Sequence, residues 1–185
     1  MLSPAESNTT MELKEIEPGL SAYVCSKSGG NWIPLQNYLD WKQKVPEAPG
    51  TPPANHAPEL GDDSKRRAFV CPESGRLMIR YKVGRGLNFH VDVSPVTGGI
   101  WLDRGEWEAL KSQGLHIELN HIFTASYQRE VRNAEYEEKL TLAFADRIGP
   151  EDFAKVDGFK TWLMAHPKAR DICVYLQHNL PEKSE

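Results

Sequence analysis

One stretch, residues 69–110, constrains the fold more than any other part of this 185-residue chain. In FVCPESGRLMIRYKVGRGLNFHVDVSPVTGGIWLDRGEWEAL, two turn sequences, CPESG and SPVTGG, flank a segment of alternating apolar and polar residues. The first and fourth residues of these turns are Cys71, Ser74, Ser94 and Thr97, with nineteen residues between the two pairs. A structural zinc site made of two C-x2-C turns has this spacing. Only one of the four positions is a cysteine, so the turns are present and most of the metal ligands are absent.

A zinc ion at these positions is disfavoured. Structural zinc takes four deprotonated thiolate or imidazole ligands, whereas Ser74, Ser94 and Thr97 keep their hydroxyl protons at neutral pH. A structural zinc supplies on the order of 10 kcal/mol of folding free energy, so packing must replace it. We therefore expect no cofactor, and we expect the hydroxyls to hydrogen-bond backbone amides and hold the turns in shape without metal.

The second turn and the residues after it resemble a known family. Residues 94–106, SPVTGGIWLDRGE, resemble the CPxCGGxWLDxGE segment of the zinc-ribbon family named after transcription factor IIB, and residues 71–75 match its preceding CPxCG turn. The stretch from His121 to Leu176 is similar to the helical tail of some bacterial members. This resemblance implies nucleic-acid-binding or transcription-associated work. The chain departs from the family at three of the four ligand positions, so zinc binding is not carried over.

An internal repeat with an offset of 69 residues places a second copy of this pattern near the N-terminus. Residues 24–32, VCSKSGGNW, align with residues 93–101, VSPVTGGIW. The pattern predicts a strand from Glu12 to Ile16, a Pro18-Gly19 turn, a strand from Leu20 to Cys25 and a short helix from about Leu35. This copy shows no obvious first turn in its sequence.

The segment between the two turns of the better-matching copy is predicted to be a β-hairpin. Ile79, Tyr81 and Val83 alternate with polar residues and face the core, as do apolar residues after the Gly84-Arg85-Gly86 turn. Between Lys65 and His90 seven basic residues oppose one acidic residue, in a chain whose net charge is −4. The basic residues are candidates for phosphate contacts: Lys65, Arg66, Arg67, Arg76, Arg80, Lys82 and Arg85. The alternative is a solvated strand face whose charges neutralise acidic helices of the same molecule.

After Gly114 the apolar residues recur at helical spacing. Gly149-Pro150 ends one helix and begins the next, with acidic residues in the new first turn. His166-Pro167 ends that helix, and a last helix carries Cys173 in an apolar stripe, where we expect an inert core thiol. The long helix has two interpretations. Its apolar surface is either wider than one domain can bury and therefore binds a partner or a second copy, or it belongs to an ordinary helix-bundle core.

The sequence thus predicts an α+β protein of two small, degenerate, zinc-ribbon-like β-hairpin units followed by a C-terminal helical segment. The expected boundaries are a disordered tail at 1–10, a half-ribbon at 11–44, a Pro-rich linker at 45–66, a degenerate ribbon at 67–113, a helical region at 114–180 and a tail at 181–185. No run of about eighteen apolar residues is present, so we expect no membrane partner. Three scattered cysteines argue against a disulfide framework and favour a reducing cytoplasm.

No catalytic motif is found. His116, Glu118 and His121 form H-x-E-x-x-H, which is not the H-E-x-x-H spacing that places two histidines on one helical face. G-x-S-x-G, P-loop and Rossmann fingerprints are absent from the sequence. The sequence favours a non-enzymatic, cytoplasmic binding protein whose partner is nucleic acid at the basic hairpin. The competing hypothesis is a protein–protein adaptor or homo-oligomerising scaffold that has lost both zinc and nucleic-acid binding.

Overall fold

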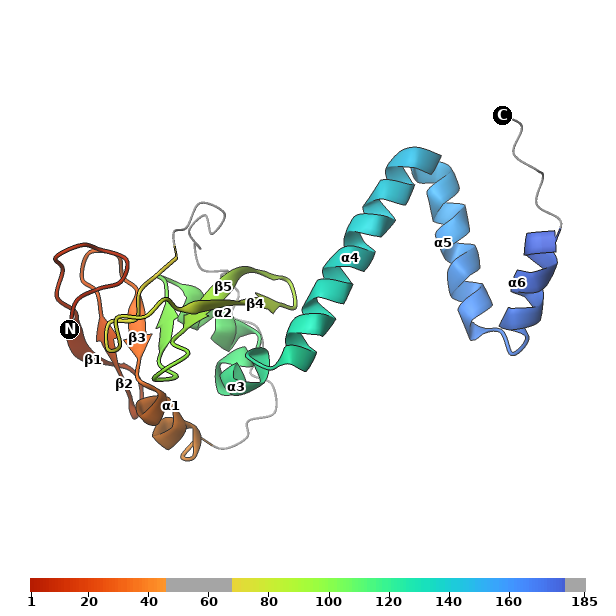
Figure 1. Ribbon diagram of the computed structural model, residues 1–185. Coiled ribbons are helices and arrows are strands. Elements are labelled where there is room, and N and C mark those ends of the chain that lie inside the picture. Colours follow the sequence, from red (N-terminus) through yellow and green to blue (C-terminus); the bar gives the residue numbers. More distant parts are fainter. Residues whose placement is uncertain (46–67, 179–185) are drawn as a thin grey trace. The chain divides into compact units, whose positions relative to one another are not determined.

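The computed structural model of the chain describes residues 1–45 and 68–178 (Figure 1). It shows an α+β protein, with a six-stranded antiparallel sheet in the N-terminal half followed by C-terminal helices. The chain divides into two compact units, residues 1–132 and 133–185, and the division falls inside helix α4 (Ala125–Ile148). Apart from residue 45, the expected linker at 45–66 and the expected tail at 181–185 lie outside the described residues.

The sheet consists of two three-stranded halves. Its strand order is β1-β2-β3-β6-β5-β4, so β3 and β6 join the halves at the centre and every neighbouring pair is antiparallel. The strands are β1 (Glu12–Glu17), β2 (Leu20–Val24), β3 (Asn31–Ile33), β4 (Ile79–Gly84), β5 (Leu87–Val93) and β6 (Ile100–Leu102). The sequence predicted two separate hairpin units joined by a linker. The structure instead merges them into one continuous sheet.

The β4–β5 hairpin forms, but its predicted alternation is confirmed only in part: Val83 is buried and Tyr81 half-buried, whereas Ile79, predicted to face the core, is 46% exposed at the start of this edge strand. Tyr81 lies opposite Val91, and Lys82 lies opposite His90 on the other face. The turn between the strands has positive φ at Gly84, Arg85 and Gly86, which is the twist that a two-residue hairpin loop needs.

The two halves pack against each other through equivalent residues. Trp32 lies directly opposite Trp101, its counterpart in the 69-residue repeat. A Cβ atom added to Gly30 would lie 2.3 Å from the Trp101 ring, and one added to Gly99 would lie 2.2 Å from the Trp32 ring. Each Gly-Gly turn therefore makes room for the tryptophan of the other half, so the repeat is an intramolecular pair.

Hydrophobic clusters cover both faces of the sheet. The smaller cluster contains side chains from both halves, including the equivalent Trp32 and Trp101; its members are Met11, Cys25, Trp32, Cys71, Met78 and Trp101. The larger cluster lies on the opposite face, because neighbouring side chains of a strand alternate between faces. The larger cluster is covered by α1 (Leu35–Lys42), α2 (Glu106–Ser112), the short 3-10 helix η2 (Leu115–Ile117), α3 (Leu119–Ile122) and the first turns of α4 (Figure 1).

Residues 1–10 are not the disordered tail that their polarity suggested. Leu2 and Thr10 form an antiparallel bridge, the Ser3 amide donates to the Thr9 carbonyl at 2.8 Å, and Ser3 and Thr9 are buried. The bridge between Val70 and Leu77 closes the corresponding turn of the second half. The first half therefore has a first turn, which the sequence did not reveal because no cysteine marks it.

Helix α2 begins at Glu106, after Gly105 with φ 81°. The Glu106 carboxylate accepts a hydrogen bond from the Asp103 amide at 2.8 Å, as a capping box would have it. The Asp103 carboxylate accepts a hydrogen bond from the Trp101 indole at 2.7 Å.

The boundaries between the last three helices lie where the sequence predicted, whereas the break between α3 and α4 at residues 123–124 was not predicted. Helix α5 (Pro150–Ala165) has its proline in the first turn, and α6 (Ala169–His178) follows His166-Pro167. Residues 115–132, expected to belong with the C-terminal helices, are part of the first unit. Cys173, predicted to be a core thiol, is exposed. Within the described residues, no helix has the length and apolar character needed to cross a membrane.

Candidate binding sites

The four positions of the second half that match zinc-ligand spacing form a hydrogen-bonded cluster around Cys71. Its Sγ atom accepts the Ser74 amide at 3.3 Å and lies 3.8 Å from Thr97 Oγ1. Ser94 Oγ accepts the amides of Val96 at 3.3 Å and Thr97 at 3.1 Å. The hydroxyl oxygen of Ser94 thus takes the backbone amides of its turn, as expected from the sequence.

A second cluster of the same design surrounds Cys25 in the first half. Ser3 Oγ accepts the amides of Ala5 and Glu6, both at 3.3 Å, and Ser28 Oγ accepts the Gly30 amide at 3.2 Å. We call these two groups the Cys25 cluster and the Cys71 cluster. Sequence analysis missed the first because its turn contains serine where a cysteine would have marked it.

The polar groups around the two buried sulfur atoms affect their acidity. Burial acts to raise the pKa of Cys25, but the side chains of Ser28 and Ser3 and nearby backbone amides outweigh it, so the pKa is lowered. Burial likewise opposes a lowering of the Cys71 pKa by the polar groups of Ser74 and Ser94 and by backbone amides. Both thiols are free.

Neither cluster has the donors that zinc requires. Each contains a single cysteine, and the other positions are mostly hydroxyls that cannot replace thiolates at neutral pH. Across residues 1–45 and 68–178, no three His, Cys, Asp or Glu side chains are grouped so that they could hold a metal ion. Cys25 and Cys71 belong to the same hydrophobic cluster, but each lies in the turn of its own half.

The basic face of the β4–β5 hairpin is largely occupied by contacts within the chain. Arg80 Nε lies 3.8 Å from the carboxylate of Asp92, which is 1% exposed. Arg85 lies 3.8 Å from the Glu118 carboxylate and 5.6 Å from the centre of the Tyr127 ring. Two of the candidate phosphate-binding residues therefore already face a carboxylate of the same chain.

The other candidates on the hairpin differ in their surroundings. The side chain of Gln128 in α4 makes two hydrogen bonds to the backbone of Lys82. Gln128 Oε1 accepts from the Lys82 amide at 3.2 Å, and Gln128 Nε2 donates to the Lys82 carbonyl at 2.8 Å. Arg76 is exposed. Lys65, Arg66 and Arg67 lie outside the described residues.

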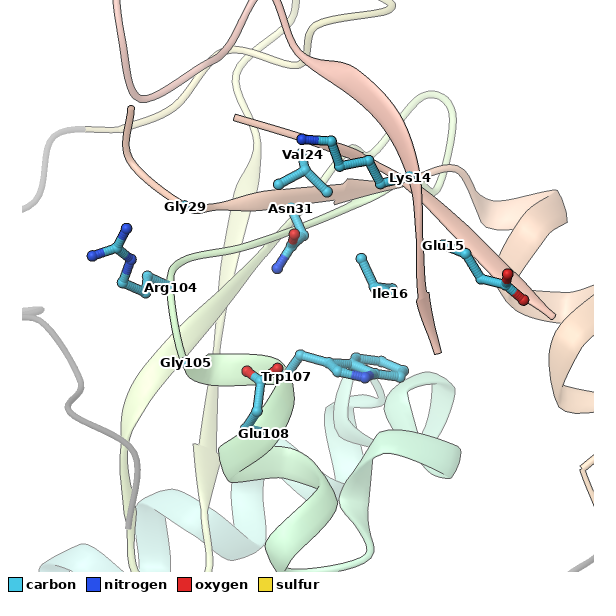
Figure 2. A pocket seen from close by; sticks show the side chains of 10 residues that line it. All are labelled: Lys14, Glu15, Ile16, Val24, Gly29, Asn31, Arg104, Gly105, Trp107 and Glu108. Carbon is cyan, nitrogen blue, oxygen red and sulfur yellow. The ribbon is translucent and has the colours of Figure 1, made fainter. Parts of the chain in front are cut away.

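A hollow of about 530 Å³ lies beside β1, β3 and the start of α2 (Figure 2). Two charged side chains at its rim have partners close by in the sequence. Lys14 Nζ lies 2.8 Å from the Glu12 carboxylate, and the Glu15 carboxylate accepts a hydrogen bond from the Gly19 amide at 2.5 Å. Asn31 lies on its wall and is 9% exposed. The lining residues are Lys14, Glu15, Ile16, Val24, Gly29, Asn31, Arg104, Gly105, Trp107 and Glu108.

The lining of this hollow contains no serine, cysteine or histidine side chain, and its ionisable groups are those of Lys14, Glu15, Arg104 and Glu108. Asn31 is its most unusual member, since the equivalent position in the second half is the buried Ile100. The 69-residue alignment, which places Asn31 opposite Ile100, was the sequence signal that could have identified this position.

The H-x-E-x-x-H residues do not assemble a site. His116 lies between the rings of Trp41 and Trp107, at centroid distances of 5.9 and 5.7 Å, and burial lowers its pKa. Glu118 pairs with Arg85. His121 is exposed beside the ring of Tyr127.

The second unit exposes apolar side chains along all of its helices. No residue of 133–178 is buried. A groove of about 290 Å³ lies between α4 and α5, and we call it the α4–α5 groove; it is lined by Glu137, Leu140, Thr141, Phe144, Ile148, Phe153, Val156, Asp157 and Lys160. Twelve large hydrophobic residues are exposed in this unit: Tyr136, Leu140, Leu142, Phe144, Ile148, Val156, Phe159, Trp162, Met164, Val174, Tyr175 and Leu176.

Comparison with known proteins adds no relative. No family model, no curated protein and no solved structure matches the chain. The resemblance of residues 71–106 to zinc ribbons therefore stays a prediction, and function has to be inferred from the residues themselves.

Proposed function

We propose that this chain is a non-enzymatic protein-interaction scaffold. The unit of residues 1–132 is its folded body, and the helices of residues 133–178 carry the partner-binding surface. One observation carries the proposal: twelve large apolar side chains are exposed in the second unit, and none of its described residues is buried.

The energetic reason is the free energy that remains to be gained by covering this surface. Burying a large apolar side chain stabilises a protein by about 1.5 to 3 kcal/mol. Extended apolar patches on a protein surface mark sites of interaction with other proteins or membranes. Acidic and basic residues are interspersed along these helices rather than forming the basic face of a membrane-surface helix, which favours a protein partner.

We further propose that the folded body descends from a zinc ribbon that has lost its metal. The Cys25 and Cys71 clusters support this descent, because in both a sulfur or hydroxyl oxygen accepts the backbone amides of a tight turn. The role of these clusters in the scaffold is to maintain the shape of the turns.

Photo-crosslinking in cells tests the scaffold proposal without assuming the identity of the partner. A photoreactive phenylalanine analogue replaces Phe144 in the α4–α5 groove, and in a control it replaces Asp146, which lies about 160° around the same helix. We expect a discrete protein adduct from position 144 and a much weaker one from position 146. Failure of the groove positions Leu140, Phe144 and Val156 to crosslink to any protein would contradict the proposal.

Nucleic-acid binding is the second candidate. It is favoured by the exposure of Arg76 and by the Arg85 side chain, which remains 54% exposed despite its contact with Glu118. Binding of labelled single- and double-stranded nucleic acid at two salt concentrations tests it, since phosphate contacts make affinity fall steeply with salt. Arg80→Glu combined with Lys82→Glu should abolish such binding and leave helix-mediated association unchanged. A matched double reversal, Lys139→Glu with Lys155→Glu, should leave it intact.

A further inference from the structure

The 69-residue repeat provides an internal reference for the hollow beside β1, β3 and the start of α2 (Figure 2). Three polar residues of the hollow align with apolar residues of the other half: Asn31 with Ile100, Arg104 with Leu35 and Glu108 with Leu39. Ile100 is completely buried, and Leu39 packs against the larger hydrophobic cluster. The fold therefore accepts apolar side chains at the equivalent positions, and the polar ones need another explanation.

Arg104 and Leu35 also take equivalent places in the folded chain. A Cβ atom added to Gly29 would lie 2.5 Å from Arg104 Nε, and one added to the equivalent Gly98 would lie 2.6 Å from Leu35 Cδ2. Each side chain therefore lies against a glycine in the turn of the opposite half. The same contact holds a leucine in one half and a guanidinium beside the hollow in the other.

Asn31 is buried in the wall of the hollow, and its carboxamide lacks a hydrogen-bond partner. The residue is 9% exposed, and no other residue of 1–45 or 68–178 bonds to its side chain. Figure 2 shows the amide pointing from β3 into the hollow. Its two N–H donors and its carbonyl oxygen are therefore available to a molecule that occupies the hollow.

Two opposite charges lie beside this amide. Arg104 and Glu108 are both exposed, and neither has an ion-pair partner among the residues that the structure describes. A spacing of four residues pairs such charges within a helix, but α2 begins only at Glu106, so Arg104 lies outside it. The other two charged residues of the lining have partners close by in the sequence. One guanidinium and one carboxylate thus remain available to an occupant.

The rest of the lining is mostly apolar. Ile16 and Val24 contribute aliphatic side chains from β1 and β2, and Trp107 contributes its ring from α2. Small-molecule sites typically combine an apolar wall with a few placed polar groups in a volume of about 300 to 1,000 Å³. The hollow has this composition and a volume of about 530 Å³.

The charge pattern selects the class of ligand. A purely anionic ligand at Arg104 would bring its charge towards Glu108, and a purely cationic ligand at Glu108 would bring its charge towards Arg104. A zwitterion matches both residues. Its carboxylate accepts charge-assisted hydrogen bonds from a guanidinium and further bonds from an amide N–H group, and its ammonium group donates to a carboxylate.

We infer that this hollow binds a small zwitterion with an apolar side chain, either a free α-amino acid or a short peptide. Its carboxylate lies against Arg104 and the Asn31 amide, its ammonium group against Glu108, and its side chain against Ile16 and Trp107. The site belongs to the first unit and goes beyond the scaffold function proposed for residues 133–178.

Isothermal titration calorimetry of the full chain tests the ligand class. The probes are leucine and leucyl-leucine, and the tighter of them should bind with a dissociation constant below about 1 mM. The amide of that probe lacks the carboxylate, and its desamino analogue lacks the ammonium group. Each analogue should bind at least about 10-fold more weakly, because one charge of the site loses its partner. Tighter binding of leucine assigns the site to free amino acids, and tighter binding of leucyl-leucine assigns it to peptides.

Substitutions copied from the other half test the three polar residues. Arg104→Leu should weaken binding of the zwitterion at least about 10-fold and leave binding of its amide almost unchanged, because the amide has no carboxylate. Glu108→Leu should weaken the zwitterion and spare the desamino analogue, and Asn31→Ile should weaken the zwitterion as well. Arg76→Leu is the matched control: it removes an exposed arginine outside the hollow and should leave binding unchanged.

Three results would overturn the inference. The first is the absence of binding by either probe at about 10 mM. The second is binding that is equally tight after one charge of the ligand is removed, and the third is an equal effect of Arg104→Leu on the zwitterion and on its amide. The comparison of ligands uses the wild-type chain, so it decides the matter even if a variant fails to fold. None of these results bears on residues 133–178, so the scaffold proposal stands or fails separately.

Discussion

The two units of this chain differ in how far their large apolar side chains are buried. In residues 1–132 all four tryptophans, Trp32, Trp41, Trp101 and Trp107, are at most 3% exposed, whereas Trp162 of the second unit is 51% exposed. The first unit contains two copies of one pattern, and the copies cover each other across β3 and β6. The second unit has no second copy within its described residues. An internal duplicate encloses the apolar surface of the first unit, whereas the apolar side chains of the second unit stay exposed in its described residues.

The comparison also identifies the contacts that hold the turns of the first unit. A ring from one half lies against the Gly-Gly turn of the other, in both directions. Trp32 additionally donates from its indole to Glu73 at 3.0 Å, which connects β3 to the first turn of the second half. Contacts between the halves thus constrain the turns.

Replacing one tryptophan in each unit should give the largest contrast. Trp101→Ala removes a fully buried ring and should lower the free energy of unfolding by about 3 to 5 kcal/mol. Trp162→Ala removes an exposed ring outside the α4–α5 groove and should cost less than about 1 kcal/mol. Urea unfolding followed by circular dichroism measures both. Similar losses would show that the two units are not differently packed.

A glycine-to-alanine pair should give effects of opposite sign. In Gly30→Ala the new methyl group would lie 2.3 Å from the Trp101 ring and 3.1 Å from the Leu102 carbonyl oxygen. The resulting overpacking should cost up to about 3 kcal/mol. In Gly158→Ala the methyl group meets nothing within 4 Å, and the better helix former should add up to about 1 kcal/mol to helix stability. Thermal unfolding should show one midpoint falling and the other rising; a stable Gly30→Ala would disprove the close approach.

Removing a hydroxyl from each unit refines the comparison. Ser94→Ala leaves the Val96 and Thr97 backbone amides without the acceptor that holds their turn and should destabilise the first unit by about 1 kcal/mol. Ser94→Cys keeps an acceptor at that position and should recover part of the loss. Thr161→Ala breaks an exposed bond to the Asp157 carbonyl and should change stability by less than about 0.5 kcal/mol. Equal losses of stability in Ser94→Ala and Thr161→Ala would contradict a structural role for the Cys71 cluster.

The smallest predicted effect is a pH dependence located in the first unit. Burial between Trp41 and Trp107 lowers the pKa of His116 below its ordinary value. The unfolded chain therefore binds a proton more readily than the folded chain. Stability should be complete above pH 6.5, the ordinary value, and decline as pH falls from there through the lower folded pKa.

Replacing His116 with phenylalanine removes the titrating group and keeps an aromatic ring beside the two tryptophans. The slope of unfolding free energy against pH should be flatter in this variant than in the wild type below pH 6.5. The measurement is denaturant unfolding at a series of pH values. Identical slopes would mean that another group controls the acid sensitivity.

Several features of the fold and site could be predicted because their causes are local. The Gly84-Arg85-Gly86 turn follows from the residue types that accept positive φ, and the start of α5 follows from Pro150. The pairing of Arg80 with Asp92 depends on a register shift between Lys82 and Gly84 that the sequence pattern does not show. The burial of Ser3 depends on elements that meet only in the folded chain. Cys173 was misassigned because an apolar stripe does not show whether anything covers it.

By itself, the sequence determined the β1–β2 and β4–β5 hairpins, the succession of helices α4 to α6, the equivalence of the two halves and the absence of a zinc donor set at residues 71–97. These properties come from residue chemistry and from periodicities of two and 3.6 residues, which are set by near neighbours along the chain. The tertiary structure decided that β3 pairs with β6, that Gln128 covers the edge of β4 and that the α4–α5 groove is left open. The physical reason is that hydrophobic burial is non-directional. An apolar pattern shows that a surface must be covered, while only folding and assembly determine what covers it.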